Sequence, residues 1–72
     1  MHEILFGKTA ATPELIEWKL NDLGIKYEKK HVERILWAVV NEIDSRAKRG
    51  EDRFLVEQEF DDLCRRIVRE SS

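Results

Sequence analysis

The sequence has few of the residues that cross-link small domains. Its one cysteine, Cys64, cannot form a disulfide within the chain, and with only two histidines the chain falls short of the four ligands of a typical structural zinc site. A chain of 72 residues is one small domain at most, and such a domain buries only about 60% of the surface that its unfolded chain exposes. We therefore expect a low free energy of unfolding, with no disulfide or structural metal site to increase it.

Long apolar runs and an excess of charge of one sign are also missing. No stretch is long and apolar enough to span a bilayer, so we expect no membrane partner. The start of the chain lacks the charged-then-apolar form of a secretory signal, which together with the lone cysteine favours a reducing cytoplasm. The 13 basic and 15 acidic residues leave a net charge of −2, which gives no overall attraction to nucleic acid or membranes.

The single proline and the few glycines fall where helix boundaries are expected. Thr12 supplies an N-cap hydroxyl, Pro13 suits the first helical position, and Gly24 and Gly50 are typical of helix ends. We predict an all-α fold, a small three-helix bundle with a short extended N-terminal lead, as a single helical domain over residues 1–72. The expected parts are a lead or linker over 1–11 and helices over 12–24, 29–49 and 56–69.

The second and third helices are predicted from apolar residues at three-and-four spacing. The second stripe consists of Val32, Ile35, Leu36, Val39, Val40, Ile43 and Ala47, and the third of Val56, Phe60, Leu63, Cys64 and Ile67. Cys64 is expected to be a small buried apolar residue. The second helix has no good cap at its start, and the lysines there carry the wrong charge for that end. The opening stretch 3–6 is too short to form a sheet alone, so we expect extended chain or the end of a linker.

Gly7-Lys8-Thr9 resembles the end of a phosphate-binding loop, but its surroundings do not fit that motif. The motif needs a glycine five residues before Gly7, where this chain has His2, and a helix directly after the lysine. Residues 10–12 separate the tripeptide from the expected helix. A plain turn is therefore favoured over a nucleotide site.

No other group of residues predicts catalysis or metal binding. His2 and His31 have no carboxylate or cysteine partner at a suitable spacing, so we expect both on the solvated surface. The acidic residues Glu57, Glu59, Asp61 and Asp62 do not follow the calcium-loop pattern and are expected to be the exposed face and N-terminal charge of the third helix. We assign no catalytic residue, no metal ligand and no cofactor to this chain.

Two basic groups, within 46–53 and 65–69, could line up in a folded helical domain of the kind that binds DNA. Acidic residues are interleaved with both groups, and no aromatic residue stands among the basic ones to stack on bases. A solvated charged face is therefore favoured, and nucleic acid is an unlikely partner.

Trp18 and Trp37 lie off the main stripes of their helices on a helical wheel. Large aromatic residues outside a core stripe are often partner contacts, because interface cores are enriched in them. The alternative is that each widens the core of a domain too small to hide it. We take both tryptophans as interface candidates.

Taken in order, these pieces resemble the region after the catalytic barrel in the family of homocitrate synthase, 2-isopropylmalate synthase and citramalate synthase. In that family a G-K-H-S-G-like turn leads into a short helix ending in L-x-x-L-G. A second amphipathic helix, a charged loop, an apolar residue or two and a third helix with an acidic opening follow. The corresponding pieces here are Phe6 to Ala11, Leu20 to Gly24, the stripe from Val32 to Ala47, Glu51 to Leu55, and Glu57 to Leu63.

The resemblance covers nearly the whole chain and implies a part of an acyltransferase of amino-acid biosynthesis. It implies a helical communication subdomain that joins the barrel to any regulatory domain and leans over the active site of the neighbouring subunit in a homodimer. The expected partners are then the barrels of the same and the neighbouring subunit. The metal-assisted Claisen-type condensation of acetyl-CoA with a 2-oxo acid belongs to the barrel, so the divalent metal is expected there.

Lys8 and Thr9 are the positions that carry over from the family motif, as contacts with the partner's active site. Thr9 stands where the family has a histidine, and Ala10 and Ala11 replace its serine and glycine, which puts any role of that histidine in doubt. Two alternatives remain open: a stand-alone helical protein-interaction module, and a small helical DNA-binding domain.

Overall fold

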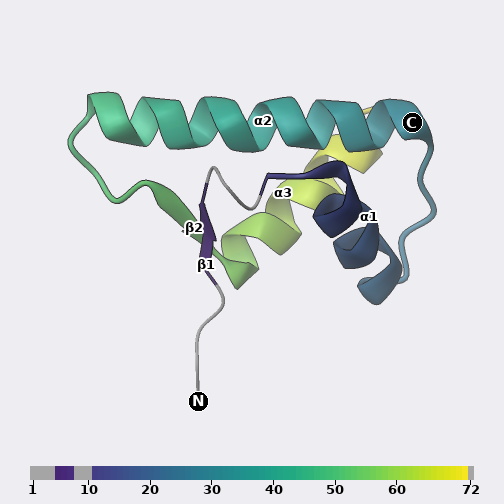
Figure 1. The fold of residues 1–72 in the computed structure, drawn as a ribbon. Helices are drawn as coiled ribbons and strands as arrows, with labels where there is room; N and C mark the ends of the chain where they lie inside the picture. Colours follow the sequence, from purple (N-terminus) through teal and green to yellow (C-terminus); the bar gives the residue numbers. More distant parts are fainter. Residues whose placement is uncertain (1–4, 8–10, 72) are drawn as a thin grey trace, which may run out of the picture.

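The structure is a computed structural model, and it describes residues 5–7 and 11–71. The elements follow in the order β1 (Leu5–Gly7), α1 (Pro13–Asp22), α2 (Lys29–Lys48), β2 (Phe54–Val56) and α3 (Glu57–Glu70) (Figure 1). The prediction of a mostly helical chain with three helices is confirmed. The helix bounds lie within two residues of the predicted ranges, and the start of α2 coincides with the predicted one; this is the usual uncertainty at frayed helix ends.

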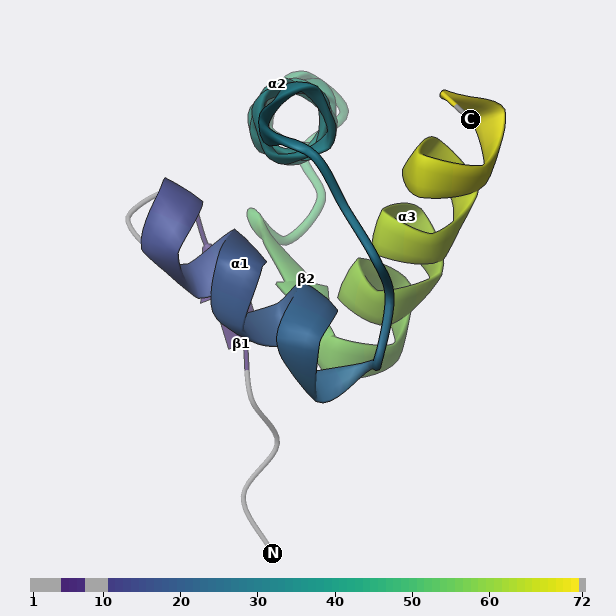
Figure 2. The same cartoon turned by 90° about the vertical axis from the view of Figure 1, so that its right-hand side faces the viewer.

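The long helix α2 forms one side of the molecule, and the other elements all lie on the same side of it (Figure 1). Viewed along α2, α1 and α3 lie below it on opposite sides, and β2 lies between them (Figure 2). Each helix turns its apolar stripe toward the space that the three enclose. The buried apolar residues are Ile16, Leu20, Val32, Ile35, Val39, Ile43, Leu55, Phe60, Cys64 and Ile67.

The first two helices end as their glycines predict. Gly24 and Gly50 have φ values of 70° and 74°, in the left-handed region that side chains with a Cβ disfavour. After α1, the N–H of Ile25 donates to the carbonyl of Leu20 at 3.0 Å, and the N–H of Gly24 donates to Asn21 at 3.1 Å. This pair of bonds is the Schellman pattern, which satisfies carbonyls that the helix leaves open. At the other end of α1, the Thr12 hydroxyl accepts from the N–H of Leu15 at 3.3 Å, as predicted for an N-cap.

The part of the expected lead that the structure describes is not unpaired extended chain. Its residues 5–7 form β1, which pairs antiparallel with β2 in the register Leu5↔Val56, Phe6↔Leu55 and Gly7↔Phe54. A stretch this short cannot form a sheet alone, but the residues before α3 are also extended and supply the missing backbone partners. The all-α prediction therefore needs this small two-stranded sheet added.

His31 is buried and not on the solvated surface, so that prediction is wrong. The residue is 5% exposed, and its Nδ1 accepts a hydrogen bond from the N–H of Glu28 at 2.9 Å. Glu28 is the N-cap of α2, and a side chain at the third helical position that reaches back to the N-cap N–H is half of a capping box. His31 thus provides the cap that the first turn of α2 otherwise lacks. His2 lies outside the described residues.

Candidate functional site

The two residues taken from the family motif, Lys8 and Thr9, lie outside the described residues. The residue before them, Gly7, ends β1 opposite Phe54. A Cβ built on Gly7 would lie 3.7 Å from the carbonyl oxygen of Arg53, an ordinary contact distance. Gly7 therefore lies beside the loop that precedes β2.

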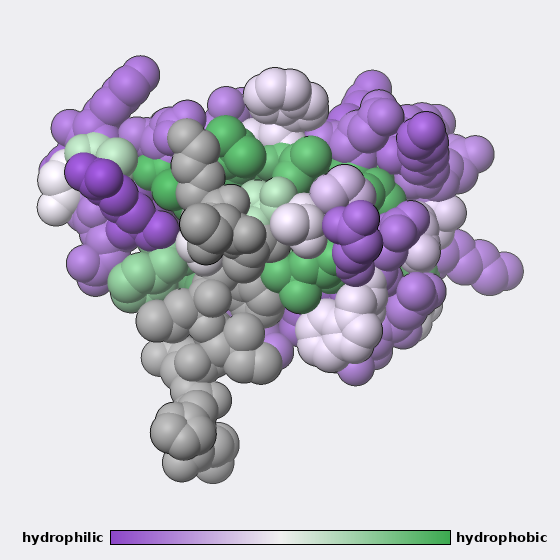
Figure 3. Space-filling model, viewed as in Figure 1, coloured by the Kyte–Doolittle hydropathy of each residue, from purple (hydrophilic) through white to green (hydrophobic). Residues whose placement is uncertain are grey.

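Both tryptophans are at the surface. Trp18 on α1 is 51% exposed and Trp37 on α2 is 66% exposed, so more than half of each residue remains accessible to solvent. The ammonium nitrogen of Lys19 lies 5.3 Å from the centroid of the Trp18 ring, within the range of a cation–π contact. Figure 3 shows apolar residues at the surface in the middle of this face, with hydrophilic residues toward both of its ends. The domain thus exposes large apolar groups that could be covered by a partner.

Lys19 is a buried charge that the sequence patterns did not predict. Its side chain is 1% exposed, and its ammonium nitrogen lies 3.0 Å from Oδ1 of Asp61 and 3.1 Å from Oε2 of Glu57. Burial alone would lower the pKa of Lys19, but the contacts with Asp61 and Glu57 outweigh it and raise the pKa above its ordinary value of 10.5. Lys19 therefore stays charged and ties α1 to α3.

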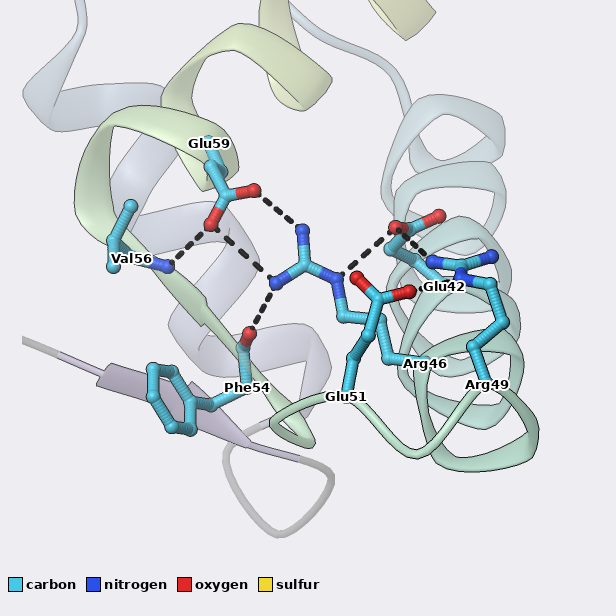
Figure 4. Close-up of polar contacts among 7 residues, drawn as sticks. All are labelled: Glu42, Arg46, Arg49, Glu51, Phe54, Val56 and Glu59. Carbon is cyan, nitrogen blue, oxygen red and sulfur yellow. Dashed lines mark hydrogen bonds and ion pairs between the residues drawn. The ribbon is translucent and has the colours of Figure 1, made fainter.

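Arg46, near the end of α2, is the centre of a second polar network (Figure 4). Its Nε donates to Oε1 of Glu42 at 3.1 Å, and its Nη1 donates to the backbone carbonyl of Phe54 at 2.6 Å. The guanidinium also forms an ion pair with Glu59, whose Oε1 in turn accepts from the N–H of Val56 at 3.1 Å. One side chain thus joins α2 to β2 and to the first turn of α3.

The charges of this network stabilise one another. The hydrogen bond to Glu59 outweighs partial burial and raises the pKa of Arg46. The same bond from Arg46, followed by the one from the Val56 N–H, lowers the pKa of Glu59 below its ordinary value of 4.5. Arg49 adds ion pairs with Glu51 and, at 3.7 Å, with Glu42. Much of the basic group in 46–53 is therefore occupied in holding the domain together.

Cys64 lies in the core, as predicted. Desolvation by burial, with a smaller effect of Asp61, raises the pKa of its thiol to about 12. A buried thiol of this kind is a poor nucleophile, because the thiolate is the reactive form.

No group of three or more His, Cys, Asp or Glu residues in the described part of the chain could hold a metal ion. Among the same residues, no helix has the length and apolar character needed to cross a membrane. The chain matches no family model, no curated protein and no solved structure.

Proposed function

We propose that this chain is the helical subdomain of a Claisen-condensing 2-oxo acid synthase of the homocitrate or isopropylmalate type. In this role it packs against the barrel of its own subunit and over the active site of the neighbouring one, and it has no catalytic activity alone. The observation that carries the proposal is the exposure of Trp18 and Trp37 on a small domain whose buried charges are paired internally. Exposed tryptophans on a rigid helical unit are typical anchors of an interface.

The strand pair also supports this proposal. In the resemblance, the turn that contains Gly7 and the apolar residues before the third helix are separate pieces of the pattern. Here Gly7 and Phe54 are paired in one sheet, so the two pieces form a single structural unit. The pairing with β2 holds β1 next to the helices. A segment that connects a barrel to a helical subdomain would need such an attachment.

A stand-alone helical protein-interaction module is the second candidate. It is favoured by the same exposed tryptophans, which require a partner surface but not a covalently linked barrel. The two candidates differ in the size of the polypeptide that carries the domain and in the identity of what binds it.

An antibody raised against the pure chain separates the two candidates. In a lysate of the cells that make the protein, we expect it to detect a polypeptide of about 40 kDa or more, because a barrel of about 250 residues would precede the domain. The captured polypeptide should release CoA when supplied with acetyl-CoA, a divalent metal and one of a panel of 2-oxo acids. Antibody pre-absorbed with the pure chain is the control for both measurements.

A band at the 8.6 kDa of this chain, with no barrel protein in the captured material, would overturn the synthase proposal. A large polypeptide whose tryptic peptides come from another kind of domain would do the same. Either result would leave the interaction module, and mass spectrometry of the captured material would then identify its partner.

A further inference from the structure

A groove lies between α2 and α3, and its floor is apolar. Ala38 on α2 and Leu63 on α3, both half-buried, line it together with the buried Leu55 of β2. Ala38 is small, so less side-chain volume stands between the two helices at this point. Neither Trp18 nor Trp37 lines the groove. We call this region the arginine groove, because Arg46, Arg65, Arg66 and Arg69 also line it.

The arginine groove is lined by four arginines and three carboxylates, so its lining is slightly basic although the chain as a whole is acidic. Three carboxylates line it, but Glu42 and Glu59 are held by Arg46, and Asp62 lies 3.7 Å from Arg65. Arg66 and Arg69 are exposed, and neither forms an ion pair within the described residues. They are three positions apart on α3, so they project from the same side of that helix.

We propose that the arginine groove binds an acidic amphipathic peptide segment of a partner protein. An apolar side chain of the segment seats on Ala38 and Leu63, and its carboxylates pair with Arg66 and Arg69. Arginine suits this role because its planar guanidinium binds a carboxylate through two parallel hydrogen bonds. A nucleic-acid backbone fits less well, since it carries no apolar side chain to seat on Ala38 and Leu63 and would leave the apolar floor uncovered.

The test begins with a displayed random-peptide library selected on the immobilised 72-residue chain. As a comparison, the same library is selected in parallel on the double variant Arg66→Glu/Arg69→Glu, and no peptide is removed for binding that variant. We expect the peptides that survive to carry Asp or Glu around a Leu, Ile or Phe. The affinity of a labelled survivor is then measured by fluorescence anisotropy over a range of salt concentrations.

We expect Arg66→Glu/Arg69→Glu to weaken binding about tenfold or more, because each charged hydrogen bond is worth roughly one such factor. Rising salt should weaken binding to the unaltered chain as well. Ala38→Leu fills the floor without changing charge and should also weaken binding. Lys26→Glu/Arg53→Glu makes the same change of charge at two exposed residues outside the groove and should leave the affinity within about twofold, because surface charges act weakly at a distance in salt. Circular dichroism establishes that all variants are folded.

Three results would each overturn the proposal. The selected peptides could lack acidic residues, or the two double variants could lose affinity equally. The chain could instead bind a duplex oligonucleotide or anionic lipid vesicles and no peptide. All of these outcomes are measured on the chain itself, so they leave the synthase proposal and its test by polypeptide mass unaffected.

Discussion

Lys19 on α1 and Asp61 on α3 meet with 3.0 Å between the ammonium nitrogen and Oδ1, while only 1% of the lysine side chain is exposed. A charge with so little access to water is stable only when its partners are in place. Because these contacts raise the pKa of Lys19 above 10.5, their contribution to stability is complete below that pH and is lost as the pH rises through the higher folded-state value.

Replacing Lys19 tests this buried ion pair. Lys19→Met keeps much of the side-chain length but leaves Asp61 without its counter-charge, so we expect a loss of about 2 kcal/mol in the free energy of unfolding. The double variant Lys19→Met/Asp61→Leu should recover most of that loss, since an apolar pair of similar volume can replace an ion pair. Urea unfolding followed by circular dichroism measures both. Lys26→Met, at an exposed lysine, is the control and should change stability by less than about 0.5 kcal/mol.

Arg46→Lys tests whether the shape of the guanidinium matters as well as its charge. Lysine cannot reach Glu42, Glu59 and the Phe54 carbonyl at once, so we expect a loss of roughly 1 to 2 kcal/mol. Hydrogen exchange at the Val56 amide should also become faster, because β2 would lose its attachment to α2. Arg49→Lys, at a half-exposed arginine, should have little effect on either measurement. Equal effects of the two substitutions would contradict a special role for Arg46.

The lowered pKa of Glu59 predicts acid sensitivity. A carboxyl group with a lowered folded-state pKa adds stability that is present above its unfolded value of 4.5 and is lost as the pH falls through the lower folded value. Urea unfolding between neutral pH and about pH 3 should therefore show a decline in stability on the acid side. Glu59→Gln should be less stable at neutral pH and should show a shallower decline. A decline of unchanged slope in this variant would assign the acid sensitivity to other carboxyl groups.

The interface role of the tryptophans predicts a difference between the isolated chain and the intact protein. In the isolated chain, hydroxyl-radical footprinting read by mass spectrometry should oxidise Trp18 and Trp37 readily, since both are more than half exposed. In the polypeptide captured from cells, we expect one or both to be protected. Trp37→Ala should change the stability of the isolated chain by less than about 0.5 kcal/mol while weakening capture of the partner. Equal oxidation in both preparations would contradict an interface at these residues.

The helices could be predicted from the sequence because their signals are local. The stripe from Val32 to Ala47 repeats at helical spacing, and Gly24 and Gly50 mark the turns where a positive φ is needed. The strands could not be predicted in this way. Leu5–Gly7 and Phe54–Val56 have three residues each, too few to show an alternating pattern, and their pairing depends on the fold between them.

Two buried polar residues were missed although a signal for each was present. Lys19 follows Ile16 by three residues and precedes Leu23 by four, which places it on the apolar side of α1. Its partners Glu57 and Asp61 are four apart and share one side of α3. His31 precedes the buried Ile35 by four residues in the same way. Charge and polarity suggested exposure, but position on the helix decided burial.

The pairing of β1 with β2 has a mechanical consequence. A pull on the chain ahead of Leu5 acts first on the backbone hydrogen bonds between the strands and through them reaches Phe54–Val56. That strand runs without a break into α3, so part of the load reaches the last helix directly, although α1 and α2 come earlier in the sequence. A displacement of the chain ahead of Leu5 is therefore transmitted through β2 to α3, the helix that carries Arg66 and Arg69.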